Sequence, residues 1–305
     1  MKKRTYLVIS AGIMLVCALF AGCTIVALEI CAQAFDRVEE SFQHHYLPYR
    51  GEYPREELRF NSGGKKLQGF IYGGSNGNGL IVLSEGLGCT ADYYFPMIRF
   101  FVDKGWRVFA FNNTGVSGSE GESIRGLTQS VVDLDAALAY VKNSGKFDGL
   151  PVMLAGHSWG GYAVCAVLNY HHRVNAVVSF AGYNNGGDLL KEQGIMRLGG
   201  AYYVVSPQLW AIEKQLFGST AKLTALDGIN KAGIPVMIAH SSNDDIIPAG
   251  TTSIYARRGK ITNPLAKIIY KEGEDAAGHW PYNDIYGELD IVLMERIHQF
   301  FNNAH

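Results

Sequence analysis

The stretch that most limits what this chain can fold into is Leu150-Pro-Val-Met-Leu-Ala-Gly-His-Ser-Trp-Gly-Gly161. A short apolar run ends in a G-x-S-x-G pentapeptide centred on Ser158, and residues 162–170, which have the composition of a helix, follow directly. At so tight a corner, side chains two positions before and two positions after the serine would collide with neighbouring backbone, so glycine stands there. The pattern therefore predicts a strand, a sharp turn that presents Ser158, and a helix.

The rest of the chain alternates short apolar runs with longer periodic segments. Several runs are apolar almost throughout, as expected for parallel strands covered on both faces. In residues 129–142, apolar side chains recur at three- and four-residue intervals, which predicts one apolar helix face. The predicted strands are 57–60, 67–72, 80–84, 107–112, 152–155, 176–181, 236–240 and 266–270, and the predicted helices are 93–103, 129–142, 162–170 and 289–301.

This alternation predicts an α/β fold with an open, mostly parallel sheet flanked by helices. The first two strands, joined by Gly63-Gly-Lys-Lys66, are expected to form an antiparallel hairpin. About fifty residues, 183–232, interrupt the alternation, and a segment of that length is seldom a structureless loop. We expect one domain over residues 57–305, with 183–232 as a helical cap insertion.

The N-terminus predicts a membrane anchor. Lys2, Lys3 and Arg4 precede residues 5–28, which carry no charge. About 20 apolar residues cross a bilayer as a helix, and the basic flank should stay in the cytoplasm. We therefore expect residues 1–28 to be an uncleaved signal anchor and the domain to be extracytoplasmic. The alternative is a lipoprotein, because Phe20-Ala-Gly-Cys23 resembles a lipobox in which Cys23 would be cleaved and lipidated.

Residues 29–56 are predicted to form a stalk between anchor and domain. The charged run from Asp36 to Glu40 suggests that the anchor helix continues into water, and Pro48 and Pro54 would end any helix.

Composition excludes several classes of partner and cofactor. The net charge of −1 gives no reason to expect nucleic acid. The five cysteines show no spacing typical of metal or redox motifs, and the histidine pairs have no ligand beside them, so we expect no metal. Gly115, Gly118 and Gly121 do not have dinucleotide-loop spacing, and no cofactor is expected.

Two later segments could activate a serine, whose hydroxyl is a poor nucleophile without a base and an orienting acid. A predicted strand runs into a polar turn that holds Asp244 and Asp245, followed by Ile-Ile-Pro248. Gly278-His279 lies in a loop beyond the last predicted strand. With the G-x-S-x-G turn and Phe111-Asn-Asn-Thr-Gly-Val-Ser-Gly-Ser119, these motifs resemble the alpha/beta-hydrolase superfamily over residues 57–302.

The resemblance implies a catalytic triad of Ser158 as nucleophile, His279 as base and Asp244 as acid. Asp244 is preferred to Asp245 because the frame Asp-x-x-Ile-Pro begins at Asp244. It also implies that the backbone amides of Trp159 and Leu87 bind the oxyanion.

Glu85 stands where many relatives carry histidine in the loop Ser84-Glu-Gly-Leu-Gly88. The resemblance implies a serine hydrolase that cleaves a small-molecule carboxylic ester or other acyl substrate. Two alternatives remain open: a peptidase or amidase with the same triad, and a non-catalytic binding protein that retains the scaffold.

Overall fold

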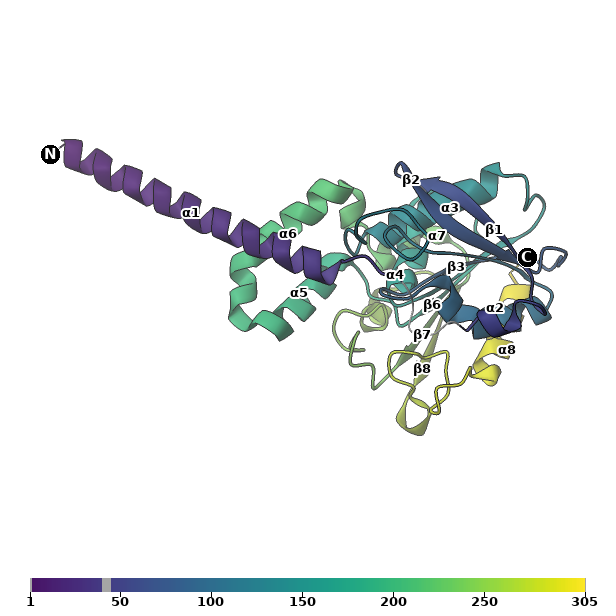
Figure 1. Cartoon of the computed structure of the whole chain (residues 1–305). Coiled ribbons are helices and arrows are strands. Elements are labelled where there is room, and N and C mark those ends of the chain that lie inside the picture. The colour runs from purple at the N-terminus through teal and green to yellow at the C-terminus, as the bar shows by residue number, and fades with distance from the viewer. Residues whose placement is uncertain (1, 40–44, 305) are drawn as a thin grey trace.

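The computed structural model describes residues 2–39 and 45–304. Within these residues an eight-stranded sheet forms the centre, in the order β1-β2-β4-β3-β5-β6-β7-β8 (Figure 1). Every strand predicted from the sequence is present, with ends that differ by at most two residues. The strands are β1 (Arg55–Ser62), β2 (Lys65–Tyr72), β3 (Leu80–Ser84), β4 (Arg107–Phe111), β5 (Val152–His157), β6 (Ala176–Phe180), β7 (Val236–Ser241) and β8 (Ala266–Lys271).

The sheet is mostly parallel, as predicted. β1 and β2 form the expected antiparallel hairpin, β2 also pairs antiparallel with β4, and the remaining neighbours are parallel. β5 lies inside the sheet between β3 and β6. The carboxyl end of an inner parallel strand is where open α/β sheets place their ligands, and Ser158 directly follows that end.

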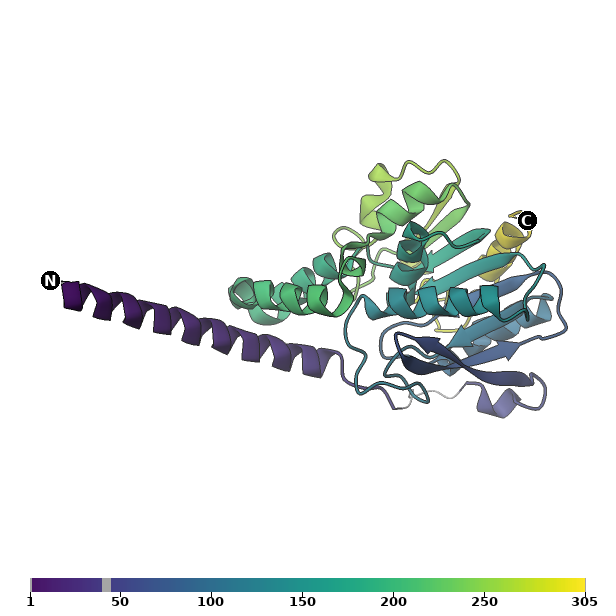
Figure 2. The ribbon, with the colours of Figure 1, turned by 90° about the horizontal axis from the view of Figure 1, so that it is seen from above.

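Helices cover both faces of the sheet (Figure 2). Successive residues of one strand point to opposite faces, so Leu154 joins one core cluster and Met153 the other. The first cluster contains α3 (Gln129–Asn143), α4 (Trp159–Ala166) and α7 (Ala225–Ala232), and the second contains α2 (Phe95–Asp103) and α8 (Ile291–Asn302). The apolar stripe predicted in α3 is buried through Val131, Leu134 and Leu138.

The insertion between β6 and β7 is helical. Its first two helices, α5 (Gly186–Leu198) and α6 (Tyr202–Phe217), form a hairpin that projects from the sheet (Figure 1). The side chain of Asn185 caps α5 by accepting a hydrogen bond from the Asp188 amide. The third helix, α7, returns to the sheet and packs against α4.

The chain begins with α1 (Lys2–Ala34), which lies beside α6. By its length and composition, its segment Ile9–Ala34 could cross a membrane. A signal sequence has the same length and composition, so these two properties do not distinguish it from an anchor.

The helical extension expected from Asp36 to Glu40 was wrong for the described part, because α1 ends at Ala34. Phe35 turns into the core and is 5 % exposed, and Arg37 donates hydrogen bonds to the carbonyl groups of Ser119 and Gly121. These tertiary contacts outweigh helix extension there. Residues 40–44 of the predicted stalk lie outside the described residues.

Candidate active site

Ser158 occupies a strained corner between β5 and α4. Its backbone has φ 54° and ψ −109°, a region that side chains other than glycine rarely adopt. Glycines make the corner sterically allowed: a Cβ on Gly156 would lie 2.3 Å from the Gly160 carbonyl oxygen, and one on Gly160 would lie 2.1 Å from the Ser84 carbonyl oxygen. Strain of this kind persists where the surrounding structure enforces it, often at functional sites.

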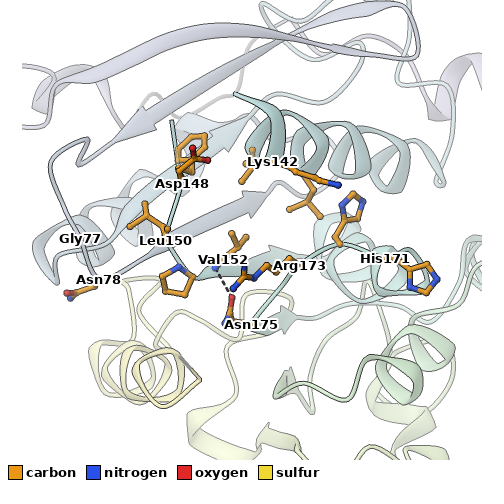
Figure 3. A pocket seen from close by; sticks show the side chains of 15 residues that line it. Gly77, Asn78, Lys142, Asp148, Leu150, Val152, His171, Arg173 and Asn175 are labelled. Carbon is orange, nitrogen blue, oxygen red and sulfur yellow. Dashed lines mark hydrogen bonds between the residues drawn. The ribbon is translucent and has the colours of Figure 1, made fainter. Parts of the chain in front are cut away.

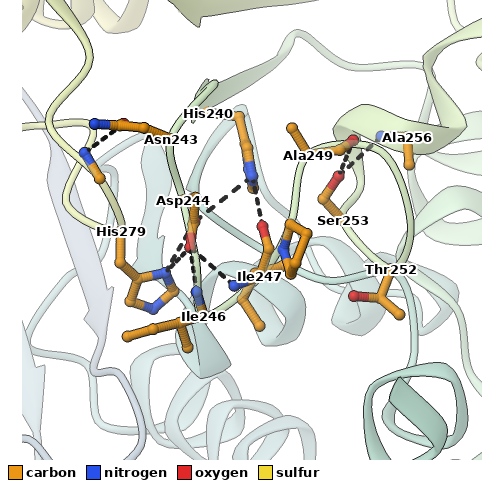
Figure 4. A network of polar contacts seen from close by, with 12 residues as sticks. His240, Asn243, Asp244, Ile246, Ile247, Ala249, Thr252, Ser253, Ala256 and His279 are labelled. Atoms are coloured by element: carbon orange, nitrogen blue, oxygen red, sulfur yellow. Dashed lines mark hydrogen bonds and ion pairs between the residues drawn. The ribbon is translucent and has the colours of Figure 1, made fainter. Parts of the chain in front are cut away.

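Asp244 and His279 come together at the ends of β7 and β8, as Figure 4 shows. Nδ1 of His279 lies 3.0 Å from Oδ1 and 2.9 Å from Oδ2 of Asp244. The backbone amides of Ile246 and Ile247 donate to Oδ1 of Asp244 at 3.0 and 2.8 Å. The carboxylate is thus fixed from two sides, while the neighbouring Asp245 is exposed.

His240 is a further neighbour of this carboxylate. It is fully buried at the end of β7, and burial lowers its pKa, which favours the neutral ring. Its Nε2–H donates to the Ile247 carbonyl at 2.9 Å and lies 3.6 Å from Oδ2 of Asp244. His240 therefore holds the turn that carries Asp244, a role that its strand position alone did not reveal.

Ser158 and His279 line one cavity of about 770 Å³. Within the described residues no hydrogen bond joins the two side chains. Because Nδ1 of His279 faces Asp244, Nε2 is the ring nitrogen left for another partner. Trp159 and Trp280 line the same cavity, whereas Trp210 is not among its lining residues. The walls are mainly apolar, as in pockets that hold organic ligands.

The two residues predicted to bind the oxyanion, Leu87 and Trp159, line the same cavity as Ser158. Trp159 is the first residue of α4, where the amide has no acceptor within the helix. Leu87 lies in the loop after β3 and lines the cavity.

The side chain of Glu85 connects the loop of Leu87 to Asn113. It is 1 % exposed and accepts from the Asn113 amide at 2.8 Å and from Nδ2 of Asn113 at 3.1 Å. Burial raises the pKa of Glu85 well above its usual range. The loop that holds Leu87 is thus held in place by the buried acid Glu85, which stands where many relatives carry histidine.

A hydrogen-bonded chain connects the Leu87 loop to the His279 loop, and the sequence did not reveal it. The Gly86 amide donates to Oη of Tyr94, which lies 2.9 Å from Nδ1 of His157. Nε2 of His157 lies 2.8 Å from the His279 carbonyl oxygen and must donate there. Burial, and next the proximity of His279, lower the pKa of His157 well below its usual range. A neutral His157 that accepts from Tyr94 satisfies every bond.

A second cavity lies at the opposite end of β5, where residues such as Lys142, Asp148 and His171 line it (Figure 3). Ser158, Asp244 and His279 are not among its lining residues. The candidate active site is therefore the cavity at the carboxyl end of β5.

Comparisons with known proteins concern the family and the fold of the chain. The serine aminopeptidase S33 family model matches residues 75–211. The quorum-quenching protein AidA of Acinetobacter baumannii (strain MDR-ZJ06) is 27 % identical over 135 residues, and that match spans 43 % of this chain and 44 % of AidA.

Solved structures show the same fold at low sequence identity. The Pyrococcus furiosus esterase Pf2001 has a TM-score of 0.65 at 15 % identity, covering 88 % of this chain and 98 % of the esterase. Est1E of Butyrivibrio proteoclasticus, solved with ferulic acid bound, has a TM-score of 0.58 at 14 % identity, covering 81 % and 98 %. The chain thus has the alpha/beta-hydrolase fold.

Proposed function

We propose that this chain is a serine hydrolase that cleaves a carboxylic ester through an acyl-enzyme. Ser158 is the nucleophile, His279 the general base and Asp244 the carboxylate that orients it. The observation that carries the proposal is the contact between Asp244 and His279, because His279 lines the same cavity as a serine held at φ 54°. A fixed imidazole beside a strained, presented hydroxyl is the arrangement that acyl transfer requires.

The first half of the reaction forms the acyl-enzyme. Nε2 of His279 removes the proton from Ser158 as Oγ bonds to the ester carbonyl carbon. The carbonyl oxygen becomes an oxyanion that accepts hydrogen bonds from the Leu87 and Trp159 amides; loss of one such donor typically lowers turnover ~10²–10³-fold. The intermediate then expels the alcohol, which takes the proton from His279.

The second half releases the acid. Water gives one proton to His279 as its oxygen bonds to the acyl carbon, and collapse returns that proton to Oγ of Ser158. One ester and one water thus give one acid and one alcohol, without a cofactor. The Asp244 side chain stabilises the imidazolium that forms twice per turnover.

Replacing Ser158 by Ala tests the proposal. We expect hydrolysis of p-nitrophenyl butyrate to fall by about 10⁴-fold or more while the thermal unfolding midpoint stays unchanged. Ser75→Ala, at an exposed serine in the loop before β3, is the matched control and should retain full activity. Full activity in Ser158→Ala would refute the assignment. A folded wild-type protein inactive on every ester and amide tested would favour a non-catalytic binding protein.

A peptidase or amidase is the second candidate, favoured by the description of the matching family model. The same residues would cleave an amide, with the amine as leaving group. Rates of the wild-type chain on matched ester, thioester and aminoacyl amide substrates separate the two. The ester proposal requires that the ester be the best substrate after correction for its intrinsic reactivity.

We also propose that α1 anchors the chain in a membrane as an uncleaved helix, with the domain outside the cytoplasm. Replacing Cys23 by Ser should leave the size of the protein and its resistance to carbonate extraction unchanged. Lipidation at Cys23 would instead require that the variant change in size and lose its lipid. Protease accessibility in intact cells or spheroplasts tests the orientation.

A further inference from the structure

The candidate membrane helix and the helical hairpin of the insertion form one apolar unit. Buried and half-buried side chains of α1 and of the hairpin pack in a single cluster: Cys23, Ala27, Ile30 and Cys31 from α1, and Ile195, Tyr202, Val205, Leu209 and Ile212 from α5 and α6. N-terminal to Cys23, residues 9–22 of α1 are exposed on every side. The hairpin therefore covers only the C-terminal part of α1.

The end of the hairpin is apolar and largely uncovered. We call residues 195–205, Ile-Met-Arg-Leu-Gly-Gly-Ala-Tyr-Tyr-Val-Val, the hairpin tip. Met196 is 65 % exposed, and Tyr203 and Val204 are each 61 % exposed. Arg197 is the one charged residue in this stretch, and a long arginine side chain can lie along an apolar surface with its head in the interface. Exposed apolar side chains gathered on one short segment are a feature of interaction sites.

Lengths place the hairpin tip at the level of a membrane surface. At about 1.5 Å per residue, the uncharged segment from residue 5 to residue 22 measures about 27 Å, close to the hydrocarbon thickness of about 30 Å. Both views show the hairpin beside the C-terminal half of α1, with α1 continuing beyond it (Figures 1 and 2). Tyrosine, present twice in the tip, is enriched at membrane–water interfaces.

The candidate membrane helix α1 and the helical hairpin also line the candidate active site. Ile30 and Ala34 of α1, and Phe35 directly after it, line the cavity that holds Ser158, and so do Leu189, Leu198 and Leu209 of the hairpin. A substrate in this cavity thus contacts apolar side chains that continue along α1 to the membrane segment.

We propose that the hairpin tip inserts into the bilayer beside α1 and that the cavity takes long-chain acyl esters resident in that bilayer. The proposal rests on the proposed ester hydrolysis and on anchoring by α1. The occupant of the apolar tip is lipid because the tip adjoins the one described helix that can span a membrane and carries a single charge. A second copy of the chain is the competing occupant.

Insertion is measured directly with the full chain reconstituted in phosphatidylcholine vesicles. Tyr203→Trp places a reporter in the tip, and Tyr286→Trp, at a tyrosine that is 84 % exposed near the start of α8, is the matched control. Relative to the wild-type protein, lipids brominated on their acyl chains should quench the added fluorescence of Tyr203→Trp and leave that of Tyr286→Trp unquenched. Equal quenching of both, or of neither, overturns insertion. If the chain oligomerises and the Tyr203→Trp fluorescence is not quenched, the hairpin tip instead contacts a second copy of the chain.

Substrate delivery is measured with a tip variant, Tyr203→Ser with Val204→Ser, against a control variant, Tyr286→Ser with Val292→Ser. The control residues are 84 % and 82 % exposed. Because membrane binding scales with buried apolar area, the tip variant should hydrolyse a vesicle-embedded long-chain ester about tenfold more slowly. Both variants should retain wild-type rates on soluble p-nitrophenyl butyrate.

The two assays separate the failure of this inference from the failure of the proposed function. If the wild-type chain hydrolyses neither ester, the proposed function fails, and the quenching result alone decides whether the tip inserts. If the wild-type chain is active and the tip variant matches the control variant on the vesicle-embedded ester, delivery through the tip is refuted.

Discussion

Replacing Asp244 by Asn tests the triad at the residue that the sequence left between two candidates. In the structure Oδ1 of Asp244 accepts from two backbone amides and Oδ2 lies 2.9 Å from Nδ1 of His279. The asparagine oxygen can keep both backbone bonds, which directs its NH₂ group at His279. Two donors cannot bond to each other, so His279 must carry its proton on Nε2 instead. That nitrogen can then no longer remove the proton from Ser158.

The expected loss follows from this change of tautomer. In a serine protease the equivalent change lowers kcat about 10⁴-fold, which corresponds to about 5.4 kcal/mol of activation free energy. The free energy of unfolding should fall by only about 1–3 kcal/mol, because the bonds to the backbone amides lose the charge but remain.

Asp245→Asn is the matched control, since Asp245 is exposed and adjacent. Initial rates on p-nitrophenyl butyrate, with urea unfolding of each variant, provide the measurement. We expect a loss of about 10⁴-fold in kcat for Asp244→Asn and less than about twofold for Asp245→Asn. Activity of Asp244→Asn within tenfold of the wild-type enzyme, or equal losses in both variants, would refute the assignment of the acid.

Three further changes test the surroundings of the site. His157→Phe removes the donor to the His279 carbonyl, so steady-state kinetics should show kcat lowered about 10²-fold with little change in KM. An unchanged kcat would show that the hydrogen bond from His157 does not position His279. Gly160→Ala should lower the free energy of unfolding in urea by about 3 kcal/mol or more. The control Gly74→Ala, where a Cβ meets nothing within 4 Å, should lower it by less than about 0.5 kcal/mol. Equal effects would contradict the close approach of Gly160 to the Ser84 carbonyl oxygen. The pKa of Glu85 is raised in the folded state, so the folded state keeps a proton that the unfolded state loses near pH 4.5. The free energy of unfolding should therefore fall as the pH rises above 4.5. Glu85→Gln should flatten this decline, and an unaltered slope of unfolding free energy against pH would contradict a buried protonated acid.

The sheet was predictable because buried parallel strands are apolar throughout and are separated by helices of regular period. All eight predicted strands recur in the structure, and the fold prediction is confirmed. The pairing of Asp244 with His279 was implied by the resemblance of their two loops to alpha/beta-hydrolase motifs. In the structure these loops follow neighbouring parallel strands, whose carboxyl ends lie at one edge of the sheet.

Contacts formed by tertiary packing could not be predicted in the same way. His157 had no sequence signal beyond its place in the turn, and its partners are the Tyr94 hydroxyl and a backbone carbonyl. Every residue has the same backbone carbonyl, so no sequence motif can mark this hydrogen-bond acceptor. The end of α1 at Ala34 likewise depends on Arg37 binding carbonyl groups more than 80 residues away. The packing of α1 on α6 depends on a topology that apolar composition alone does not specify.

Covalent labelling by a fluorophosphonate tests the central claim most directly, because the probe reacts only with an activated serine. We expect mass spectrometry of the labelled, folded full chain to locate one adduct, on Ser158, and His279→Ala to abolish labelling while the chain remains folded. An adduct on another serine, or undiminished labelling of Ser158 in His279→Ala, would contradict the account.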